Sequence, residues 1–381
     1  MKQYRRPHEE AIERAVLVQV IPFGQSPEDA ADSLLELERL ADTAGVVVAG
    51  QVTQRRKHPT PQFLVGEGKL EEIQLACRHA EANLIITDND LTPVQVNNLD
   101  QSLGIHVIDR TELILQIFAR RASSATAKAQ VELAQLEYLV SRIPVSRKQQ
   151  RFQGGIGMRG PGESPLQLRN DPMRKRIKEL KGKLEGLRAR GRRTRARQRW
   201  PMVSLVGYTN AGKSTLLNAL SSAEAYVDDR LFATLDVKTR QVYLGHDRLA
   251  LLSDTVGFIR HLPHGLVASF RSTLDVATES DLLLLVLDAS DAHVVDHVRI
   301  VRETLCEIEA DTVPVVIVLN KLDRVGGTLR ETLPDLFPDA LTVSARTGAG
   351  LPELKEAMRM SLEAAGAYRA PVPPPVPPWE E

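Results

Sequence analysis

The chain has 381 residues, of which 43% are hydrophobic and 26% are charged, and its formal net charge is zero. This length predicts two or three domains, and this composition excludes an intrinsically disordered chain. Cys77 and Cys306 lie too far apart to suggest a disulfide framework or a zinc site. The longest apolar run, residues 282–287, is too short to cross a bilayer, so we expect no membrane span. The cysteine usage fits a reducing compartment and the start MKQYRRPHEE has no apolar core, so we expect a cytoplasmic protein, and we expect it to be a monomer.

Residues 1–111 predict an N-terminal α/β domain. Apolar runs such as RAVLVQVI (14–21) and LIITD (84–88) alternate with amphipathic stretches such as SLLELERLADTAG (33–45). Strands spaced by helical patterns indicate βαβ units and a mostly parallel sheet. The short segment GEGK (66–69) is interpreted as a turn followed by the start of a helix.

Residues 112–199 predict two long helices joined by a loop. The stretch AKAQVELAQLEYLVSRI has apolar residues at steps of three and four, which is typical of an amphipathic helix. The segment QGGIGMRGPGESP (153–165) holds five glycines and two prolines and predicts a loop. A second helix is expected from Asp171, with Pro172 near its start. Such a pair predicts an antiparallel helical hairpin.

The second of these helices is strongly basic. Residues 169–199 contain fourteen Lys and Arg against three acidic residues, a net charge of +11. Because like charges repel unless an anion screens them, this block favours a polyphosphate partner such as RNA. The alternative interpretation is a solvated helix or an arginine-rich linker.

Residues 200–366 predict a second α/β domain, followed by a proline-rich tail at 367–381. Its strand signals are MVSLV, RQVYL, ALLSD, LLLLVLD, VPVVIVLN and ALTVS. The tail is expected to be polyproline-like and solvated, although a proline-recognition domain is an alternative partner.

The stretch GYTNAGKST (207–215) follows the first of these strands and opens a helix. It matches G-x-x-x-x-G-K-[ST], in which backbone N–H groups surround phosphates, Lys213 contacts the β- and γ-phosphates, and the Ser214 hydroxyl binds Mg²⁺. The candidate phosphate-binding residues are Gly207, Tyr208, Thr209, Asn210, Ala211, Gly212, Lys213, Ser214 and Thr215.

DTVG (254–257) ends another strand about forty residues later. Asp254 is expected to hold Mg²⁺ through water, and the Gly257 N–H is expected to face the γ-phosphate. The segment between the two motifs must supply a threonine that reaches Mg²⁺; Thr234 is our choice and Thr239 the alternative. The predicted metal ligands are therefore Ser214, Thr234 and Asp254, and the predicted catalytic residues are Lys213, Thr234 and Gly257.

NKLD (320–323) follows the strand VPVVIVLN and predicts guanine specificity. The Asp323 carboxylate can accept hydrogen bonds from N1–H and N2–H of guanine, whereas adenine has no donor at N1. Asn320 is expected to brace the base and the phosphate loop, and the Lys321 stem to cover the base. The following VSART (343–347) adds Ser344, Ala345, whose N–H could meet guanine O6, and Arg346. The predicted ligands are GTP or GDP, with Mg²⁺.

Phe258 stands where many small GTPases have a glutamine that orients the attacking water. Phosphoryl transfer depends mainly on positioning and electrostatics, so this phenylalanine does not exclude GTP hydrolysis. We expect a slow intrinsic rate that rises when a partner binds.

Taken together, these motifs resemble those of the HflX GTPases of the translation-factor class. The resemblance also covers VTQRRKHP, VGEGKLEEI, DRTELILQIFARRA, QVELAQLEYLV and GGIGMRGPGE, and it extends over residues 15–360. It implies an N-terminal α/β domain, a helical hairpin and a Ras-like P-loop GTPase domain. After GPGE, however, this chain has Ser164, Pro165, Leu166 and Gln167, where the family usually has Thr-Gln-Leu-Glu.

The resemblance further implies GTP-dependent association with the large (50S) ribosomal subunit and contact with 23S rRNA. The expected role is ribosome splitting, rescue or subunit biogenesis under stress. Two alternatives stay open: a GTP-dependent RNA-binding switch with negligible hydrolysis, and a GTPase of tRNA or rRNA maturation.

Overall fold

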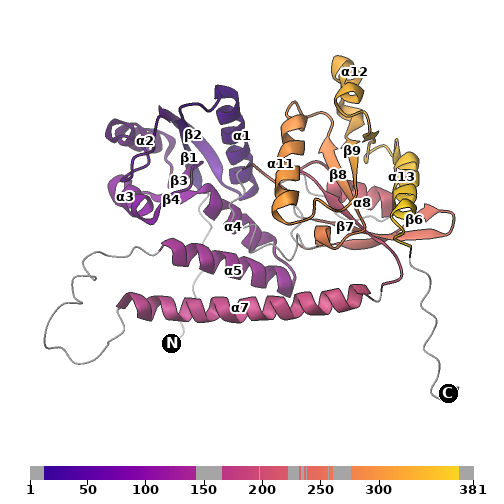
Figure 1. Cartoon of the computed structure of the whole chain (residues 1–381). Coiled ribbons are helices and arrows are strands. Elements are labelled where there is room, and N and C mark those ends of the chain that lie inside the picture. The colour runs from indigo at the N-terminus through magenta and orange to yellow at the C-terminus, as the bar shows by residue number, and fades with distance from the viewer. Residues whose placement is uncertain are drawn as a thin grey trace, which may run out of the picture. The chain divides into compact units, whose positions relative to one another are not determined.

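The computed structural model describes residues 13–142, 165–196, 198–221, 231–232, 236, 238–255, 257–260 and 276–368 (Figure 1). Thr234, residues 153–164 of the predicted loop and residues 369–381 of the predicted tail lie outside them. The chain forms two compact units, the first ending at Gly182 and the second beginning at Lys183.

The described part of the first unit contains a four-stranded sheet in the order β2-β1-β3-β4. All its strand pairings are parallel, as the alternating sequence pattern predicted. Its strands are β1 (Arg14–Pro22), β2 (Val47–Arg56), β3 (Leu84–Thr87) and β4 (His106–Asp109).

Helices cover both faces of this sheet (Figure 1). They are α1 (Pro27–Thr43), α2 (Glu67–Ala80), α3 (Pro93–Leu103) and α4 (Arg110–Arg121). On one face, Ile73 and Cys77 of α2 pack with Leu99 of α3 against Val16 and Ile85. On the other face lie α1 and α4. The helix start expected in GEGK is confirmed, because α2 begins directly after its N-cap residue Gly66.

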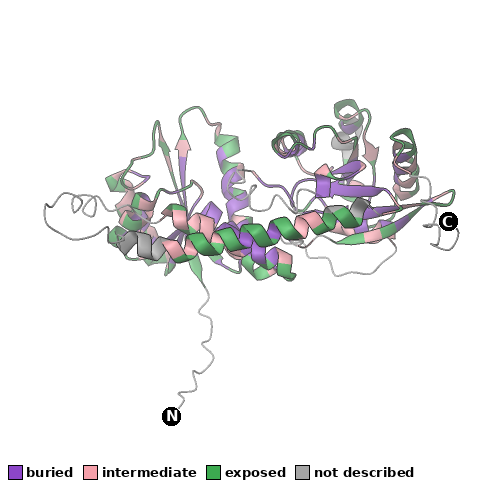
Figure 2. Cartoon of the chain, turned by 60° about the horizontal axis from the view of Figure 1, so that its bottom comes forward, coloured by how far each residue is buried: buried purple, intermediate pink, exposed green. Residues whose placement is uncertain are grey.

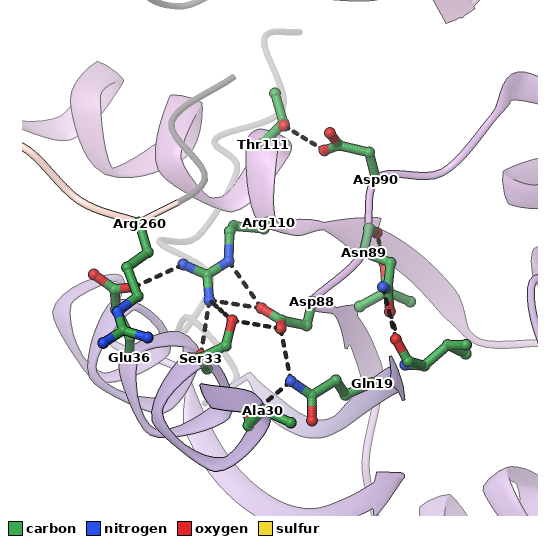
Figure 3. Close-up of polar contacts among 12 residues, drawn as sticks. Gln19, Ala30, Ser33, Glu36, Asp88, Asn89, Asp90, Arg110, Thr111 and Arg260 are labelled. Atoms are coloured by element: carbon green, nitrogen blue, oxygen red, sulfur yellow. Dashed lines mark hydrogen bonds and ion pairs between the residues drawn. The ribbon is translucent and has the colours of Figure 1, made fainter. Parts of the chain in front are cut away.

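A buried ion-pair network joins the two helices of the second face to the sheet. The Arg110 side chain at the start of α4 donates to the Asp88 carboxylate at 2.6 and 2.8 Å and to Glu36 of α1 at 3.2 Å (Figure 3). It also donates to the Ser33 carbonyl oxygen at 2.7 Å. Because each guanidinium nitrogen has an acceptor, the buried charge is compensated and holds α1, α4 and the end of β3 together.

Two long helices, α5 (Ala125–Arg142) and α7 (Pro165–Ala196), run side by side in opposite directions (Figure 1). Ion pairs join them, one between Arg176 and Glu132 at 2.6 Å and one between Lys181 and Glu137 at 2.8 Å. The expected helical start at Asp171 was wrong, because Pro172 lies inside α7. Pro165 suits the first helical position, which needs no N–H donor, and Pro172 removes one hydrogen bond without ending the helix.

The second unit has a six-stranded sheet among its described residues, in the order β10-β9-β8-β5-β7-β6. Only the pairing of β6 with β7 is antiparallel in this order. The strands are β5 (Met202–Val206), β6 (Thr239–Gly245), β7 (Arg248–Asp254), β8 (Leu282–Asp288), β9 (Val315–Asn320) and β10 (Leu341–Thr342). The mostly parallel α/β fold is therefore confirmed.

Helices also flank this second sheet. They are α8 (Lys213–Ser221), α11 (Val294–Glu307), α12 (Gly327–Leu336) and α13 (Leu351–Ala364). Leu217 of α8 and Met358 of α13 join the core of one face with Leu205 and Leu284, and α11 lies on the other face (Figure 1). The helices and strands thus leave the carboxyl ends of β5, β7, β8 and β9 at one edge, where parallel sheets bind ligands.

In the part of the chain that the structure describes, no helix combines the length and the apolar character needed to cross a membrane.

Candidate functional site

The predicted phosphate loop connects β5 to α8 and begins where β5 and β8 lie very close. Gly207 has a φ of 152°, and a Cβ added there would lie 2.2 Å from the Val286 carbonyl oxygen. No side chain fits in that gap, so only glycine allows this approach. The loop continues through Tyr208, Thr209, Asn210, Ala211 and Gly212, and Lys213, Ser214 and Thr215 open α8.

The Lys213 side chain is buried beneath this loop. Its ammonium group donates to the carbonyl oxygens of Gly207 at 2.9 Å and Tyr208 at 2.8 Å. Burial lowers the pKa of Lys213 to about 8, although the Asp254 carboxylate opposes this shift. A phosphate beside this ammonium would favour its charged form, so the site is electrostatically suited to an anion.

Ser214 and Asp254 provide the oxygen atoms expected for Mg²⁺. The Ser214 hydroxyl donates to Asp254 Oδ2 at 2.6 Å, whereas the buried Oδ1 of Asp254 has no hydrogen-bond partner among the described residues. Hydroxyl and carboxylate oxygens fit Mg²⁺, which normally takes its other ligands from water and substrate phosphate. The described residues contain no cluster of three or more His, Cys, Asp or Glu side chains that could hold a metal ion.

The alternative switch threonine, Thr239, is the first residue of β6, where it is exposed and pairs with Ser253. Because Thr239 is paired in the β-sheet, it has little freedom to move toward a metal ion bound by Ser214 and Asp254. Thr234 therefore stays our choice.

The segment after β7 is bonded to the phosphate loop through its backbone. A Cβ on Gly257 would lie 2.8 Å from Thr209 Cγ2 and 3.1 Å from Lys213 Nζ, so the main chain lies directly on the loop. The Phe258 N–H donates to the Gly207 carbonyl oxygen at 3.2 Å, and its own carbonyl accepts from the Thr209 N–H at 2.8 Å. The Phe258 side chain, only 2% exposed, fills the core.

Asn320 connects the phosphate loop with the segment VSART. Its side-chain amide donates to the Ala211 carbonyl oxygen at 3.0 Å, and its side-chain oxygen accepts from the Ala345 N–H at 3.0 Å. This second bond occupies the Ala345 N–H, the group that we expected to donate to guanine O6. The two loops are thereby fixed relative to each other.

Asp323 is held in its ionised form. The Ser344 hydroxyl donates to Asp323 Oδ1 at 2.6 Å, and this bond, with the positive charge of Arg346 as a smaller contribution, lowers the pKa of Asp323. An ionised carboxylate can accept from two neighbouring N–H groups of one base edge. The structure therefore provides the acceptor that guanine requires.

Two polar residues of the site carry no signal in the four motifs. The buried Thr255 hydroxyl donates to the Leu205 carbonyl oxygen at 2.7 Å and so anchors the end of β7 to β5. Asp288 accepts from Lys321 Nζ at 2.7 Å. Asp288 could have been suspected from its place directly after the buried run LLLLVL, at the carboxyl edge of the sheet.

Comparisons with known proteins cover nearly the whole chain. Residues 31–119 match the family model "GTP-binding GTPase N-terminal", 121–199 match "GTP-binding GTPase Middle Region", and 202–321 match "50S ribosome-binding GTPase". The crystal structure of the SsGBP and GDP complex is 25% identical, with a TM-score of 0.50, and the match covers 93% of this chain and 100% of that chain.

Two curated relatives are more similar in sequence. GTPase HflX of Caldanaerobacter subterraneus subsp. tengcongensis is 44% identical over 92% of this chain and 81% of the relative. GTPase HflX of Escherichia coli is 42% identical over 93% of this chain and 85% of the relative. These long matches agree with the order of the motifs and with the mostly parallel sheet. The chain belongs to the HflX family of GTPases.

Proposed function

We propose that the protein binds GTP and GDP with Mg²⁺ at this edge of the second unit and hydrolyses GTP on the 50S ribosomal subunit. The observation that carries this proposal is the Asn320 side chain, which bonds the phosphate loop at Ala211 and the segment VSART at Ala345. A phosphate-binding loop and a guanine-binding segment are thus parts of one site.

In this proposal, Asp323 selects guanine, and the loop from Gly207 to Thr215 surrounds the phosphates. The buried Lys213 ammonium stabilises charge that develops between the β- and γ-phosphates. Ser214, Thr234 and Asp254 are the residues that would hold Mg²⁺, which would further neutralise the phosphate charge. Gly257 places its N–H beside the γ-phosphate, because its backbone lies against Lys213.

The basic surface of α7 supports contact with 23S rRNA. Between residues 171 and 194, most of the described side chains of this helix are exposed (Figure 2). Its exposed basic residues include Arg174, Lys175, Lys178, Lys183, Arg190 and Arg193. Phosphate contacts by such residues bind RNA without reading its sequence. We infer that this hairpin contacts rRNA and that the protein splits or rescues ribosomes, or assists subunit biogenesis, under stress.

The first test measures GTP turnover with and without purified 50S subunits. We expect slow turnover by the protein alone and a clear increase with 50S subunits, both abolished by Lys213→Ala. Sedimentation of the protein with 50S subunits should be stronger in a non-hydrolysable GTP analogue than in GDP. Equal sedimentation in both nucleotides, together with no stimulation of GTP turnover by 50S subunits, would rule out a ribosome-dependent GTPase.

A second candidate is a GTP-dependent RNA-binding switch with negligible hydrolysis. The observation that favours it is the buried Phe258 side chain, which has no polar group to orient water. This candidate predicts nucleotide-dependent ribosome binding with no turnover in either condition. The same two measurements therefore separate the candidates.

A further inference from the structure

An aromatic stack joins the phosphate loop to α11. The rings of Tyr208 and His297 have centroids 3.9 Å apart and planes inclined by 11°. Both residues are nearly buried, at 7% and 9% exposure. A buried stack of this kind fixes the orientation of the tyrosine ring.

The hydroxyl group of the same tyrosine contacts the segment that follows DTVG. Tyr208 Oη accepts a hydrogen bond from the Arg260 N–H at 2.8 Å. Helix α11 approaches this segment a second time, because Arg260 Nη2 lies 3.8 Å from Asp296 Oδ2. Two adjacent residues of α11 therefore contact this pair: His297 stacks on Tyr208, and Asp296 lies near Arg260.

These contacts hold the segment that contains Gly257. The segment 257–260 is held to the phosphate loop by the two backbone hydrogen bonds of Phe258 and by the bond from Arg260 to Tyr208. Only the third bond depends on a side chain, and that side chain is oriented by His297. Loss of the third bond would remove one of the contacts that hold this segment, which also lies against Lys213 at Gly257.

His297 is itself tied to the turn that follows β8. Its Nδ1 lies 4.0 Å from Asp291 Oδ2, and the other oxygen of Asp291 accepts from the His293 N–H at 2.9 Å. Asp288, the last residue of β8 before this turn, pairs with Lys321 of the NKLD segment. The histidine thus lies close to the turn between β8 and α11.

We propose that His297 is a positioning residue for GTP hydrolysis, which acts by stacking on Tyr208 so that the tyrosine hydroxyl holds Arg260 and thereby Gly257 in place. The inference rests on the hydrolysis proposed above. Because position 258 offers no water-orienting side chain, turnover depends all the more on an accurate backbone in this segment.

The test uses four variants of the full chain. His297→Ala removes the stacked ring, His297→Phe keeps an aromatic ring, and Tyr208→Phe keeps the stack but removes the hydroxyl acceptor. Val295→Ala on the exposed side of α11 is the matched control. For each variant, kcat and KM for GTP are measured with and without 50S subunits, together with GDP affinity and thermal stability.

We expect His297→Ala and Tyr208→Phe to lower kcat by about fivefold, the usual effect of one lost hydrogen bond, with KM and GDP affinity unchanged. His297→Phe should restore most of kcat, and Val295→Ala should behave like the unmodified protein. A role in folding alone would instead lower thermal stability and GDP affinity together with kcat.

Unchanged kcat in both His297→Ala and Tyr208→Phe overturns the inference while leaving the proposed GTPase function intact. A loss in His297→Phe as large as in His297→Ala also overturns it, because the ring would then be irrelevant. An unmodified protein that does not hydrolyse GTP in either condition overturns both proposals.

Discussion

Asn320 donates from its side-chain amide to the carbonyl oxygen of Ala211, 109 residues earlier in the chain, at 3.0 Å. Its side-chain oxygen meanwhile accepts from the Ala345 N–H. One buried amide therefore links the loop proposed to hold phosphate to the segment proposed to hold the base. A shorter side chain leaves both backbone groups without a partner and the two loops without a fixed spacing.

Replacing Asn320 by alanine should consequently weaken GDP binding by about tenfold or more, since one buried and one partly buried hydrogen bond are lost. Titration with a fluorescent GDP analogue measures this change. Asn97→Ala, at an exposed position on α3, serves as the control and should bind GDP normally. Normal GDP affinity in Asn320→Ala would show that the spacing is set elsewhere.

Asp323→Asn should change which base is bound. The amide group offers a donor where guanine presents N2–H, so GDP affinity should fall by at least about a hundredfold. Xanthine has a carbonyl oxygen at that position and should be accepted better. Competition between GDP and XDP for the variant and the unmodified protein measures the change. A variant that still prefers GDP would rule out Asp323 as the residue that recognises the base.

Gly257→Ala should reduce GTP turnover more than nucleotide binding. The added methyl group would lie 2.8 Å from Thr209 Cγ2 and 2.9 Å from Thr209 Cα, so the segment must shift. A shift of about 1 Å at a reacting site lowers rates by roughly tenfold to a hundredfold. Gly186→Ala, where an added Cβ has open space, is the control. Full turnover in Gly257→Ala would contradict the proposed placement of its N–H.

Acid should destabilise the first unit through Asp88. Burial would raise the pKa of this carboxyl group, but Arg110 and the hydrogen bonds from Ser33 and Gln19 outweigh burial and lower it. A carboxyl group with a lowered pKa stabilises the fold above its unfolded-state pKa of about 4, and this stabilisation is lost as the pH falls through the folded-state pKa.

Hydrogen-exchange protection factors in β3 should therefore decrease as the pH falls below about 4. Asp88→Asn should lower protection at neutral pH and flatten this dependence, because Arg110 loses its closest partner. Asp42→Asn, at an exposed position, is the control. An unaltered pH dependence in Asp88→Asn would mean that other carboxyl groups cause the acid sensitivity.

Neutralising the basic helix should weaken RNA binding without affecting GTP. We expect the fourfold substitution of Arg190, Arg192, Arg193 and Arg195 by glutamine to reduce the slope of log affinity against log salt by about 0.7 to 0.9 for each phosphate group that the helix no longer neutralises. Arg302→Gln, an exposed position on α11, controls for removal of a charge elsewhere. If RNA affinity and its salt slope are unchanged, the basic block is a solvated helix.

The sequence predicted the elements that depend on local pattern. The strands MVSLV and LLLLVLD match β5 and β8 residue for residue, because buried parallel strands are continuous apolar runs. The sequence pattern places the start of α7 too late. It suggests that the helix begins beside Pro172, whereas the chain is already helical at that residue. A proline alone does not distinguish these cases.

The site was predictable only where a motif fixes the spacing. Lys213, Asp254 and Asn320 come together as their motifs suggest. The contacts of Thr255 and His297 arise from tertiary packing between segments far apart in the chain, which no local pattern encodes. The role of Phe258 was not predictable from the sequence either. Its position suggested only the lack of a glutamine side chain that orients water, whereas its burial shows that the ring packs in the core.

The backbone of Lys321 has a further consequence. Its φ of 63° is a left-handed conformation, which costs a residue with a side chain about 1 kcal/mol or more. The ion pair between its ammonium group and Asp288 offsets this strain. The backbone turn at the NKLD segment is thus braced from within the unit itself, by the contact between Lys321 and Asp288 at the end of β8.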